Sequence, residues 1–223
     1  MQPPTVAGVL LAAGSGSRLG RPKALVVVGG QSMARRGITL LRDGGTDPVI
    51  VVTGATGSDA GVAGSDAGVA GSDAGVAGQA GRARGVISVH NPDWSAGMGS
   101  SLAVGLGAVP DECAAAVVAL ADQPLVGPEA VRRLLAAHAA GASVAVACYD
   151  GRPRNPVLIG REHWPEVIAL ASGDVGARPF LRAHSDLVTE VECGDTGRPD
   201  DVDSPDDLAR IEALLARNAQ SPS

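Results

Sequence analysis

The sequence has few aromatic residues, few cysteines and no long apolar run. Because Phe, Trp and Tyr make up only 2% of its 223 residues, a core has to be built from Val, Leu, Ile and Ala. The three cysteines, Cys113, Cys148 and Cys193, form no C-x-x-C pair, which argues against a disulfide framework and favours a reducing compartment. No run approaches the roughly 20 apolar residues that span a bilayer, and the N-terminus has no secretion-signal pattern. We therefore expect a soluble, cytoplasmic protein without a membrane partner.

Positive charge is also scarce. The formal net charge is −6, so the sequence has no basic footprint for nucleic acid, and a small metabolite is the expected partner. Lys23 is the only lysine, because the other seventeen basic residues are all arginines. A composition that disfavours lysine this strongly makes Lys23 a candidate for a position that needs an ammonium group. The alternative is that one surface lysine survived by chance.

The first apolar run, residues 6–12, predicts a buried strand that opens into a glycine-rich loop. Glycines allow positive φ and let main-chain N–H groups approach an anion, and serines add hydroxyl donors. Arginine offers a planar fork for phosphate oxygens, whereas lysine offers a compact charge. The loop combines all of these phosphate-binding groups in Gly14, Ser15, Gly16, Ser17, Arg18, Gly20 and Lys23.

Two common phosphate loops are excluded. A P-loop needs Ser or Thr after its Gly-Lys pair, but here Pro22 precedes Lys23 and Ala24 follows it. A dinucleotide fingerprint needs G-x-G-x-x-G and an acidic residue at the end of the next strand. Here the spacing is G-x-G-x-x-x-G, and the next predicted strand ends at Thr53 and Gly54.

The ordered residues from Leu11 to Lys23 resemble the signature loop of nucleotidyltransferases that condense a nucleoside triphosphate with a phosphorylated acceptor, and most of all that of the molybdenum cofactor cytidylyltransferases. The resemblance implies Mg²⁺-dependent transfer of CMP from CTP to the phosphate of the molybdenum cofactor, with release of pyrophosphate. It implies catalytic roles for Lys23, Arg18 and Asp122. The nucleotide-binding residues that it implies are Leu11, Ala12, Ala13, Gly14, Ser15, Gly16, Ser17, Arg18, Lys23, Gly97, Ser100 and Ser101. CTP is favoured over GTP because the guanylyltransferase relatives tend to have Gly at the position of Ala13.

A second segment, residues 91–102, follows a predicted strand at 86–89 and is similar to the base-side loop of the same family. The resemblance places Gly97 and Ser100 or Ser101 beside the base. A helix cap after a turn is the alternative for the serines. Trp94 has two possible roles, packing in the core or stacking on the base. His90 is expected to end the strand.

Two aspartates are the expected metal ligands. Asp122 follows an almost entirely apolar predicted strand at 114–121, and ligands gather at the carboxyl ends of such strands. Mg²⁺ prefers one or two carboxylates together with phosphate oxygens and water. The resemblance adds Asp203 before Ser-Pro, with Asp201 as the second choice. The alternatives are helix-start roles, because each aspartate precedes a predicted helix.

Residues 173–178 resemble the acceptor side of the family, with Asp174 and Arg178 as acceptor-binding residues. Capping of a helix that runs to about residue 184 is an equal interpretation for Asp174. A predicted turn at 150–156 offers Arg152 or Arg154 to an acceptor phosphate. This turn departs from the family, which usually has Gly-His-Pro where residues 154–156 are Arg-Asn-Pro.

The predicted fold class is a single α/β domain over residues 1–223, with three layers and a mostly parallel twisted sheet that has one antiparallel excursion. It resembles the Rossmann-related fold of nucleotide-diphospho-sugar transferases. Ser-Asp-Ala-Gly-Val-Ala-Gly occurs three times, at 58–64, 65–71 and 72–78. We expect residues 55–84 to be a low-complexity insertion that forms a mobile surface loop, because two glycines per repeat make a poor helix. The insertion would stand in place of, or within, the crossover helix that the family usually has. The remaining strands are expected at 24–28, 49–52, 144–148, 157–159 and 187–191. One helix is expected at 32–42 and a second begins at 128. Two further helices end at about residue 184 and about residue 216.

Other functions stay open. Some close relatives are named nicotine blue oxidoreductase, which implies an NAD(P)H-dependent reductase, although the missing dinucleotide fingerprint argues against it. A different phosphorylated acceptor, such as a sugar phosphate or methylerythritol phosphate, is a further alternative, and so is a non-catalytic protein that handles the cofactor. The sequence does not indicate an oligomeric state.

Overall fold

A seven-stranded sheet organises the molecule. The computed structural model describes residues 5–56 and 85–220, and the strands lie in the order β5-β4-β1-β6-β8-β7-β9. All neighbours pair in parallel except β8, which is antiparallel to both β6 and β7. The predicted, mostly parallel sheet with one antiparallel excursion is therefore confirmed. The strands are β1 (Thr5–Leu11), β4 (Val49–Thr53), β5 (Val86–His90), β6 (Cys113–Leu120), β7 (Val144–Tyr149), β8 (Arg152–Gly160) and β9 (Val188–Glu192).

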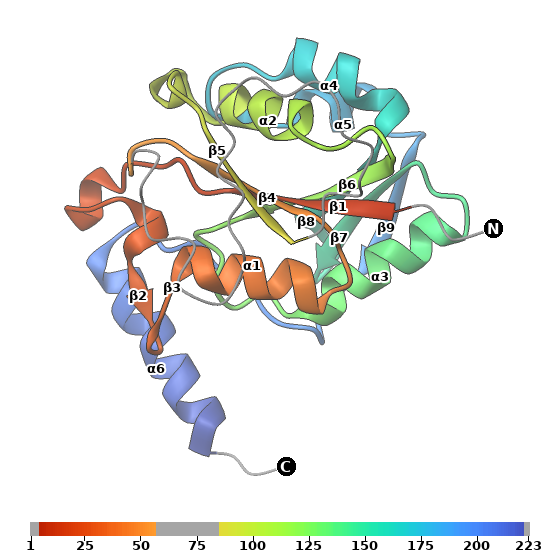
Figure 1. Ribbon diagram of the computed structural model, residues 1–223. Helices are drawn as coiled ribbons and strands as arrows, with labels where there is room; N and C mark the ends of the chain where they lie inside the picture. The colour runs from red at the N-terminus through yellow and green to blue at the C-terminus, as the bar shows by residue number, and fades with distance from the viewer. Residues whose placement is uncertain (1–4, 57–84, 221–223) are drawn as a thin grey trace.

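Helices cover both faces of the sheet and make the three predicted layers (Figure 1). One layer contains α1 (Met33–Asp43) and α3 (Pro128–Ala139), and the other contains α2 (Met98–Gly107), α4 (Trp164–Leu170) and α5 (Arg178–Ala183). Successive strand residues point to opposite faces, so Leu10 belongs to the first core and Val9 to the second. Burial on both faces explains why the strands are continuous apolar runs.

The C-terminal helix α6 (Pro205–Gln220) lies outside these layers, beside a small hairpin (Figure 1). The hairpin consists of β2 (Val27–Val28) and β3 (Gln31–Ser32). Val26 and Val28 pack with Val202 and Ile211 in a separate buried cluster. Through this cluster, the C-terminal helix supports the segment that follows the glycine-rich loop.

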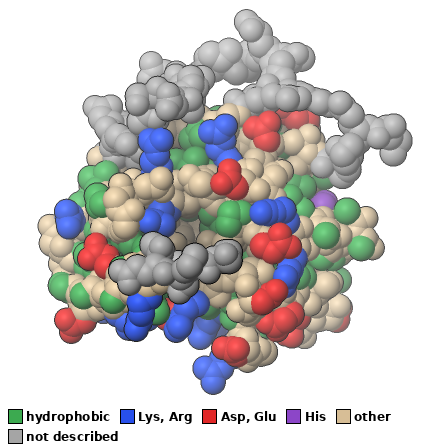
Figure 2. All heavy atoms as spheres, turned by 90° about the horizontal axis from the view of Figure 1, so that it is seen from below, with side chains coloured by type: hydrophobic (Ala, Val, Ile, Leu, Met, Phe, Trp, Pro, Cys, Tyr) green, Lys and Arg blue, Asp and Glu red, His purple; other side chains and the backbone are tan. Residues whose placement is uncertain are grey.

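Short 3-10 helices connect the larger elements. They are η1 (Ser17–Leu19), η2 (Lys23–Leu25), η3 (Trp94–Ala96), η4 (Arg161–His163) and η5 (Gly173–Val175). On the face that carries α1 and α3, basic and acidic side chains of the described residues are interspersed (Figure 2). Among the described residues, no helix is both long and apolar enough to cross a membrane.

Helix boundaries follow the sequence signals closely. Ser32 caps α1, the helix predicted at 32–42, because its side chain accepts a hydrogen bond from the Arg35 N–H at 3.3 Å. Ser204 likewise accepts from the Asp207 N–H at 3.2 Å at the start of α6. Local capping chemistry therefore fixed these two helix starts.

Two local predictions are wrong. Only Val27–Val28 of the predicted strand at 24–28 is a strand, because the chain forms η2 first and then reverses at Gly29 and Gly30, whose φ values are +54° and +81°. The predicted turn at 150–156 is limited to Asp150 and Gly151, since Arg152 already pairs with Tyr149 in the β7-β8 hairpin. The insertion predicted at 55–84 lies outside the described residues, apart from residues 55 and 56, and stays a prediction together with the single-domain boundary.

Candidate nucleotide and metal site

A cleft of about 360 Å³ opens at the carboxyl ends of β1 and β6. These strands pair in parallel, with Leu11 opposite Leu120, so the loops that follow them leave the same edge of the sheet. Ligand sites of open α/β sheets form at this edge. The cleft is lined by Leu11, Ala12, Ala13, Gly14, Ser15, Lys23, Trp94, Ser95, Gly97, Met98, Ser101, Leu120, Ala121, Asp122 and Asp174.

The glycine-rich loop folds back on itself and brings Lys23 to the cleft. The Lys23 N–H donates to Gly14 O at 3.2 Å, which closes the loop. Gly16 has φ +59°, and a Cβ there would lie 2.1 Å from Arg21 O. Only glycine fits this turn, because a side chain would meet main-chain atoms in a left-handed conformation.

Lys23 lies between two carboxylates that are distant in the sequence. Its Nζ donates to Asp122 Oδ2 at 2.7 Å and to Asp203 Oδ1 at 2.5 Å, across separations of 99 and 180 residues. Burial lowers the pKa of Lys23, but the two carboxylates outweigh burial and leave the pKa above its usual value. The group is therefore an ammonium ion at neutral pH.

The same two carboxylates fit a divalent cation. Because both oxygens contact one nitrogen, they lie no more than about 5.2 Å apart. They are hard oxygen donors, and the ammonium between them already shows that this position stabilises positive charge. Among the described residues, no group of three or more His, Cys, Asp or Glu side chains could hold a metal ion. Phosphate oxygens and water would have to complete the coordination of a cation held by this pair.

Asp201, the second choice for a metal ligand, has another partner. The buried Gln123 donates through Nε2 to Asp201 Oδ1 at 2.9 Å. Burial raises the pKa of Asp201, and the charge of Asp122 raises it further. Asp203, and not Asp201, forms the ion pair with Lys23.

On the opposite wall, a buried amide orients two serines. The Asp93 N–H donates to Asn91 Oδ1 at 3.0 Å, which fixes the orientation of the amide. Asn91 Nδ2 then donates to Ser100 Oγ at 2.9 Å and to Ser101 Oγ at 3.0 Å. Ser100 uses its hydrogen on Gly97 O or Asp93 O. In the part of the chain that the structure describes, no acceptor takes the Ser101 hydroxyl hydrogen, so Ser101 offers a donor to the cleft.

Close packing against a neighbouring segment explains why two positions of this wall are glycines. Gly97 has φ +109°, and a Cβ there would lie 2.4 Å from the main-chain carbon of Gly173. A Cβ on Gly99 would lie 2.9 Å from the main chain of Ala171. Close approach of the 171–173 segment therefore requires both glycines.

Asp174 does not cap the helix that follows it, so that prediction is wrong. Its Oδ1 accepts from the Met98 N–H at 3.3 Å, at the start of α2, because the close approach at Gly97 brings the two segments together. The helix after it, α5, begins only at Arg178 and has no side-chain cap. Asp174 lines the cleft, whereas Arg178 does not.

The structure brings most of the predicted residues together, and their roles stay predictions. Trp94 lines the cleft and also packs close to Gly54, where an added Cβ would lie 2.5 Å from the Trp94 Cβ. Sequence reasoning did not single out Ser95, Met98 or Asn91, because nothing local indicates which residues a distant segment will meet. The predicted residues that do not line the cleft are Gly16, Ser17, Arg18, Ser100, Arg178 and Asp203.

Comparisons with known proteins agree with this geometry. Residues 8–188 match the family described as MobA-like NTP transferase domain. The chain is 36% identical over 219 residues to nicotine blue oxidoreductase of Paenarthrobacter nicotinovorans, a match that covers 93% of this chain and 97% of that protein. The fold is similar to the crystal structure of Rv0371c from Mycobacterium tuberculosis H37Rv, with a TM-score of 0.73, 26% identity, and coverage of 96% of this chain and 100% of that one. A complex of Rv0371c with manganese gives a TM-score of 0.69 and 26% identity over 94% and 98% of the two chains. The chain therefore belongs to the MobA-like NTP transferase family, and it is a nucleotidyltransferase.

Proposed function

We propose that this nucleotidyltransferase transfers CMP from CTP to the phosphate of the molybdenum cofactor, with Mg²⁺ as the divalent cation. The observation that carries the proposal is the position of Lys23 between Asp122 and Asp203, beside the loop after β1. One small volume then holds a cation for the triphosphate and two carboxylates for a metal. This is the donor set that nucleotidyl transfer from a metal-bound triphosphate requires.

The reaction needs no protein nucleophile. An oxygen of the acceptor phosphate attacks the α-phosphorus of CTP, the bond from that phosphorus to the β-phosphate oxygen breaks, and pyrophosphate leaves with the electron pair. Lys23 would leave the carboxylates and donate to triphosphate oxygens, assisted by main-chain N–H groups of Gly14 and Ser15. Asp122 and Asp203 would hold the cation, which supplies charge neutralisation as pyrophosphate departs. Positioning and charge stabilisation provide the rate enhancement.

The base-side wall supports CTP as the donor. Ser101 offers a hydroxyl hydrogen, and cytosine carries two acceptors on its pairing edge, O2 and N3. Ala13 lines the cleft, and its methyl group occupies space that the Gly of the guanylyltransferase relatives would leave open, which narrows the pocket. A narrow pocket favours a pyrimidine over a purine.

The acceptor side is supported by the likeness of residues 91–102 and 173–178 to the molybdenum cofactor branch. Asp174 lies in the cleft at the start of α2, where it would accept from a donor group of the acceptor. Arg178 lies outside the cleft lining and would contact an acceptor that extends beyond it. Another phosphorylated acceptor is the alternative within the same reaction class.

A second candidate function rests on one observation, the 36% identity across 97% of nicotine blue oxidoreductase. By this alternative, the cleft would bind a reduced nicotinamide nucleotide. The loop after β1 does not have the G-x-G-x-x-G spacing that usually binds the pyrophosphate of such a cofactor. Nucleotide binding separates the two candidates directly.

The test is thermal unfolding with Mg²⁺ and CTP, GTP, ATP, UTP or NADPH in parallel, because a ligand that binds the native state raises its stability. At 100 times Kd the gain is about 2.7 kcal/mol, which corresponds to roughly 5–11 °C for a chain of this size. We expect a metal-dependent shift with CTP alone, and a shift with NADPH alone would favour the reductase.

Pyrophosphate release with the molybdenum cofactor then tests transfer. Asp122→Asn keeps the shape of the side chain but removes its charge, so we expect it to abolish metal-dependent release. Normal turnover in this variant would contradict the metal assignment. CTP binding by the wild-type chain without pyrophosphate release would instead indicate a non-catalytic protein.

A further inference from the structure

The loop that carries Asp203 is fixed to the segment after β6. The Val202 N–H donates to Asp122 O at 2.9 Å, and the Arg198 N–H donates to Leu125 O at 3.0 Å. These main-chain bonds place the loop beside Asp122. They do not by themselves set the direction of the Asp203 side chain, which leaves the chain one residue after Val202.

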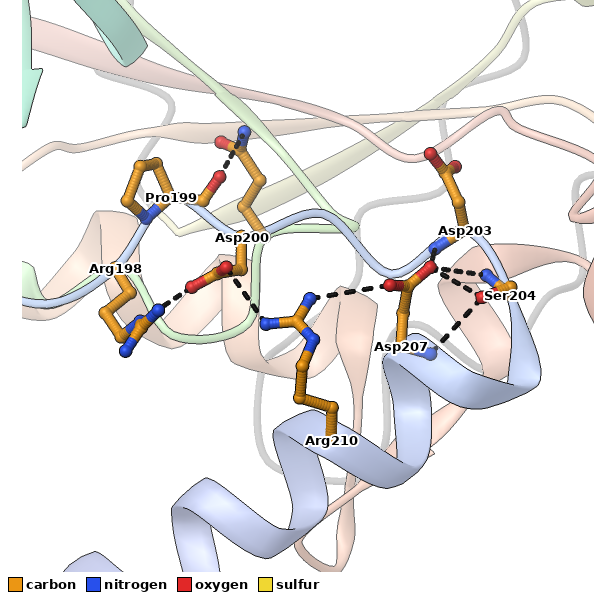
Figure 3. A network of polar contacts seen from close by, with 8 residues as sticks. Arg198, Pro199, Asp200, Asp203, Ser204, Asp207 and Arg210 are labelled. Carbon is orange, nitrogen blue, oxygen red and sulfur yellow. Dashed lines mark hydrogen bonds and ion pairs between the residues drawn. The ribbon is translucent and has the colours of Figure 1, made fainter. Parts of the chain in front are cut away.

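The first turn of α6 fixes the other side of Asp203. Asp207 Oδ2 accepts from the Asp203 N–H at 3.3 Å and from the Ser204 N–H at 3.0 Å. It also accepts from the Ser204 hydroxyl at 2.7 Å. One carboxylate oxygen therefore holds the two peptide N–H groups on either side of the Asp203 carbonyl (Figure 3).

Arg210 joins the two ends of this loop. Its Nη1 donates to Asp200 Oδ1 at 3.0 Å, and its Nη2 donates to Asp207 Oδ1 at 3.4 Å. Asp200 Oδ2 also accepts from Arg198 Nε at 2.8 Å. Figure 3 shows the guanidinium between the two carboxylates, with Asp203 beyond Asp207. Arg210 contacts neither Asp203 nor Lys23, so it can affect them only through the loop.

We propose that Arg210 is a positioning residue that aims the Asp203 carboxylate at Lys23 and at the metal that replaces it. The metal part of this inference rests on the proposed function. Arg210 holds Asp207 and Asp200 together, Asp207 holds the peptide groups around Asp203, and the carboxylate of Asp203 is presented to Lys23. Residues that hydrogen-bond a metal ligand directly typically change metal affinity by about 10- to 100-fold, and we expect a smaller change for Arg210 because it acts through Asp207.

If Arg210 only stabilised the fold, its loss would lower the melting temperature. Arg210 is exposed, and ion pairs at such positions contribute little to folding stability. The packing of Val202 and Ile211 in a buried cluster holds α6 in place without it. Loss of Arg210 should therefore leave the melting temperature almost unchanged while it loosens Asp203.

The test uses the full chain and two readouts. Because Lys23 is the only lysine, ¹⁵N-lysine labelling gives one side-chain ammonium signal in NMR, which reports the contact with Asp203 without any ligand. Binding of Mn²⁺ is measured separately from the EPR signal of the free ion. The variants are Arg210→Ala and Asp200→Asn, which remove opposite partners of the Arg210–Asp200 ion pair, here called the clamp. Arg132→Ala is the matched control, because Arg132 is an exposed helical arginine paired with Glu129 three residues away.

We expect both clamp variants to shift the Lys23 signal, to speed its hydrogen exchange and to raise the Kd for Mn²⁺ about two- to fivefold, the range that exposed ion pairs support. Arg132→Ala should match the wild type in both readouts. An unchanged Lys23 signal in the clamp variants would overturn the inference, whatever happens to Mn²⁺. If the wild type binds no Mn²⁺ but the signal still shifts, positioning of Asp203 stands and the metal role in the proposed function fails.

Discussion

Replacement of Lys23 by methionine should have opposite effects on metal and on nucleotide. The substitution keeps an unbranched side chain, one atom shorter, but removes the charge that lies between Asp122 and Asp203. Two carboxylates, whose nearest oxygens lie no more than about 5.2 Å apart, then face each other without a cation. A divalent ion would fill the gap that the ammonium leaves, whereas the triphosphate would lose its partner.

The size of the effect follows from the geometry. Two like charges about 5 Å apart repel by about 3 kcal/mol at an effective dielectric constant of about 20. The Asp203 side chain is 40% exposed, so solvent reduces the effect to about 1–2 kcal/mol. Without metal, Lys23→Met should therefore melt roughly 2–8 °C below the wild type.

Relief of the same repulsion sets the gain in metal affinity. About 1–2 kcal/mol corresponds to roughly 5- to 30-fold tighter Mn²⁺ binding by the variant in the absence of nucleotide. Affinity for CTP should fall, because the triphosphate loses the ammonium. A general folding defect would weaken both ligands together, so the opposite signs are diagnostic.

The assay is calorimetric titration of Mn²⁺ and of CTP, with melting curves recorded with and without Mn²⁺. Lys23→Arg is the control, because it keeps a positive charge between the carboxylates and should show no gain in Mn²⁺ affinity. If Lys23→Met bound Mn²⁺ no more tightly than the wild type, competition of the ammonium and the metal for one position would be refuted.

Three further predictions concern the opposite wall and the core. Ser101→Ala should weaken CTP binding while the fold is retained, because it removes the hydroxyl hydrogen offered to the cleft and leaves Asn91 Nδ2 bonded to Ser100. Equal CTP affinity in titration would contradict this role. Gly97→Ala should destabilise the chain by about 2–4 kcal/mol in urea unfolding, because its Cβ would meet Gly173 in a left-handed conformation; a loss below about 0.5 kcal/mol would refute the close approach. Burial raises the pKa of Cys148 to about 11, so at pH 8 its thiol is almost fully protonated. It should react with a thiol reagent about tenfold more slowly in the folded than in the unfolded protein, because the smaller thiolate fraction is partly offset by the higher nucleophilicity of the thiolate. Equal rates would contradict the burial of the thiol.

The sequence by itself determined the elements whose signals are local. Continuous apolar runs marked the strands because both faces of the sheet are covered by helices. The start of the helix predicted at 32–42 was correct because the capping side chain of Ser32 bonds to a main-chain N–H only three residues away. The glycine-rich loop after the first strand likewise stood out, since its φ values and its turn are properties of consecutive residues.

Tertiary structure decided where distant segments meet. Nothing near residue 152 shows that Arg152 already pairs with Tyr149 of β7, so a turn was predicted where β8 begins. Asp174 precedes α5 in the sequence and was therefore a candidate cap for that helix, but in the fold it accepts a hydrogen bond from the Met98 N–H at the start of α2.

The contact of Lys23 with Asp122 and Asp203 joins residues 99 and 180 positions apart. The pairing of β1 with β6 sets the first separation, and the docking of residue 202 on residue 122 sets the second. Local patterns report only neighbours along the chain, whereas a charged cluster at the edge of a sheet depends on strand order and on the packing of α6. The residue types of the candidate site were therefore readable in advance, and their arrangement was fixed by the fold.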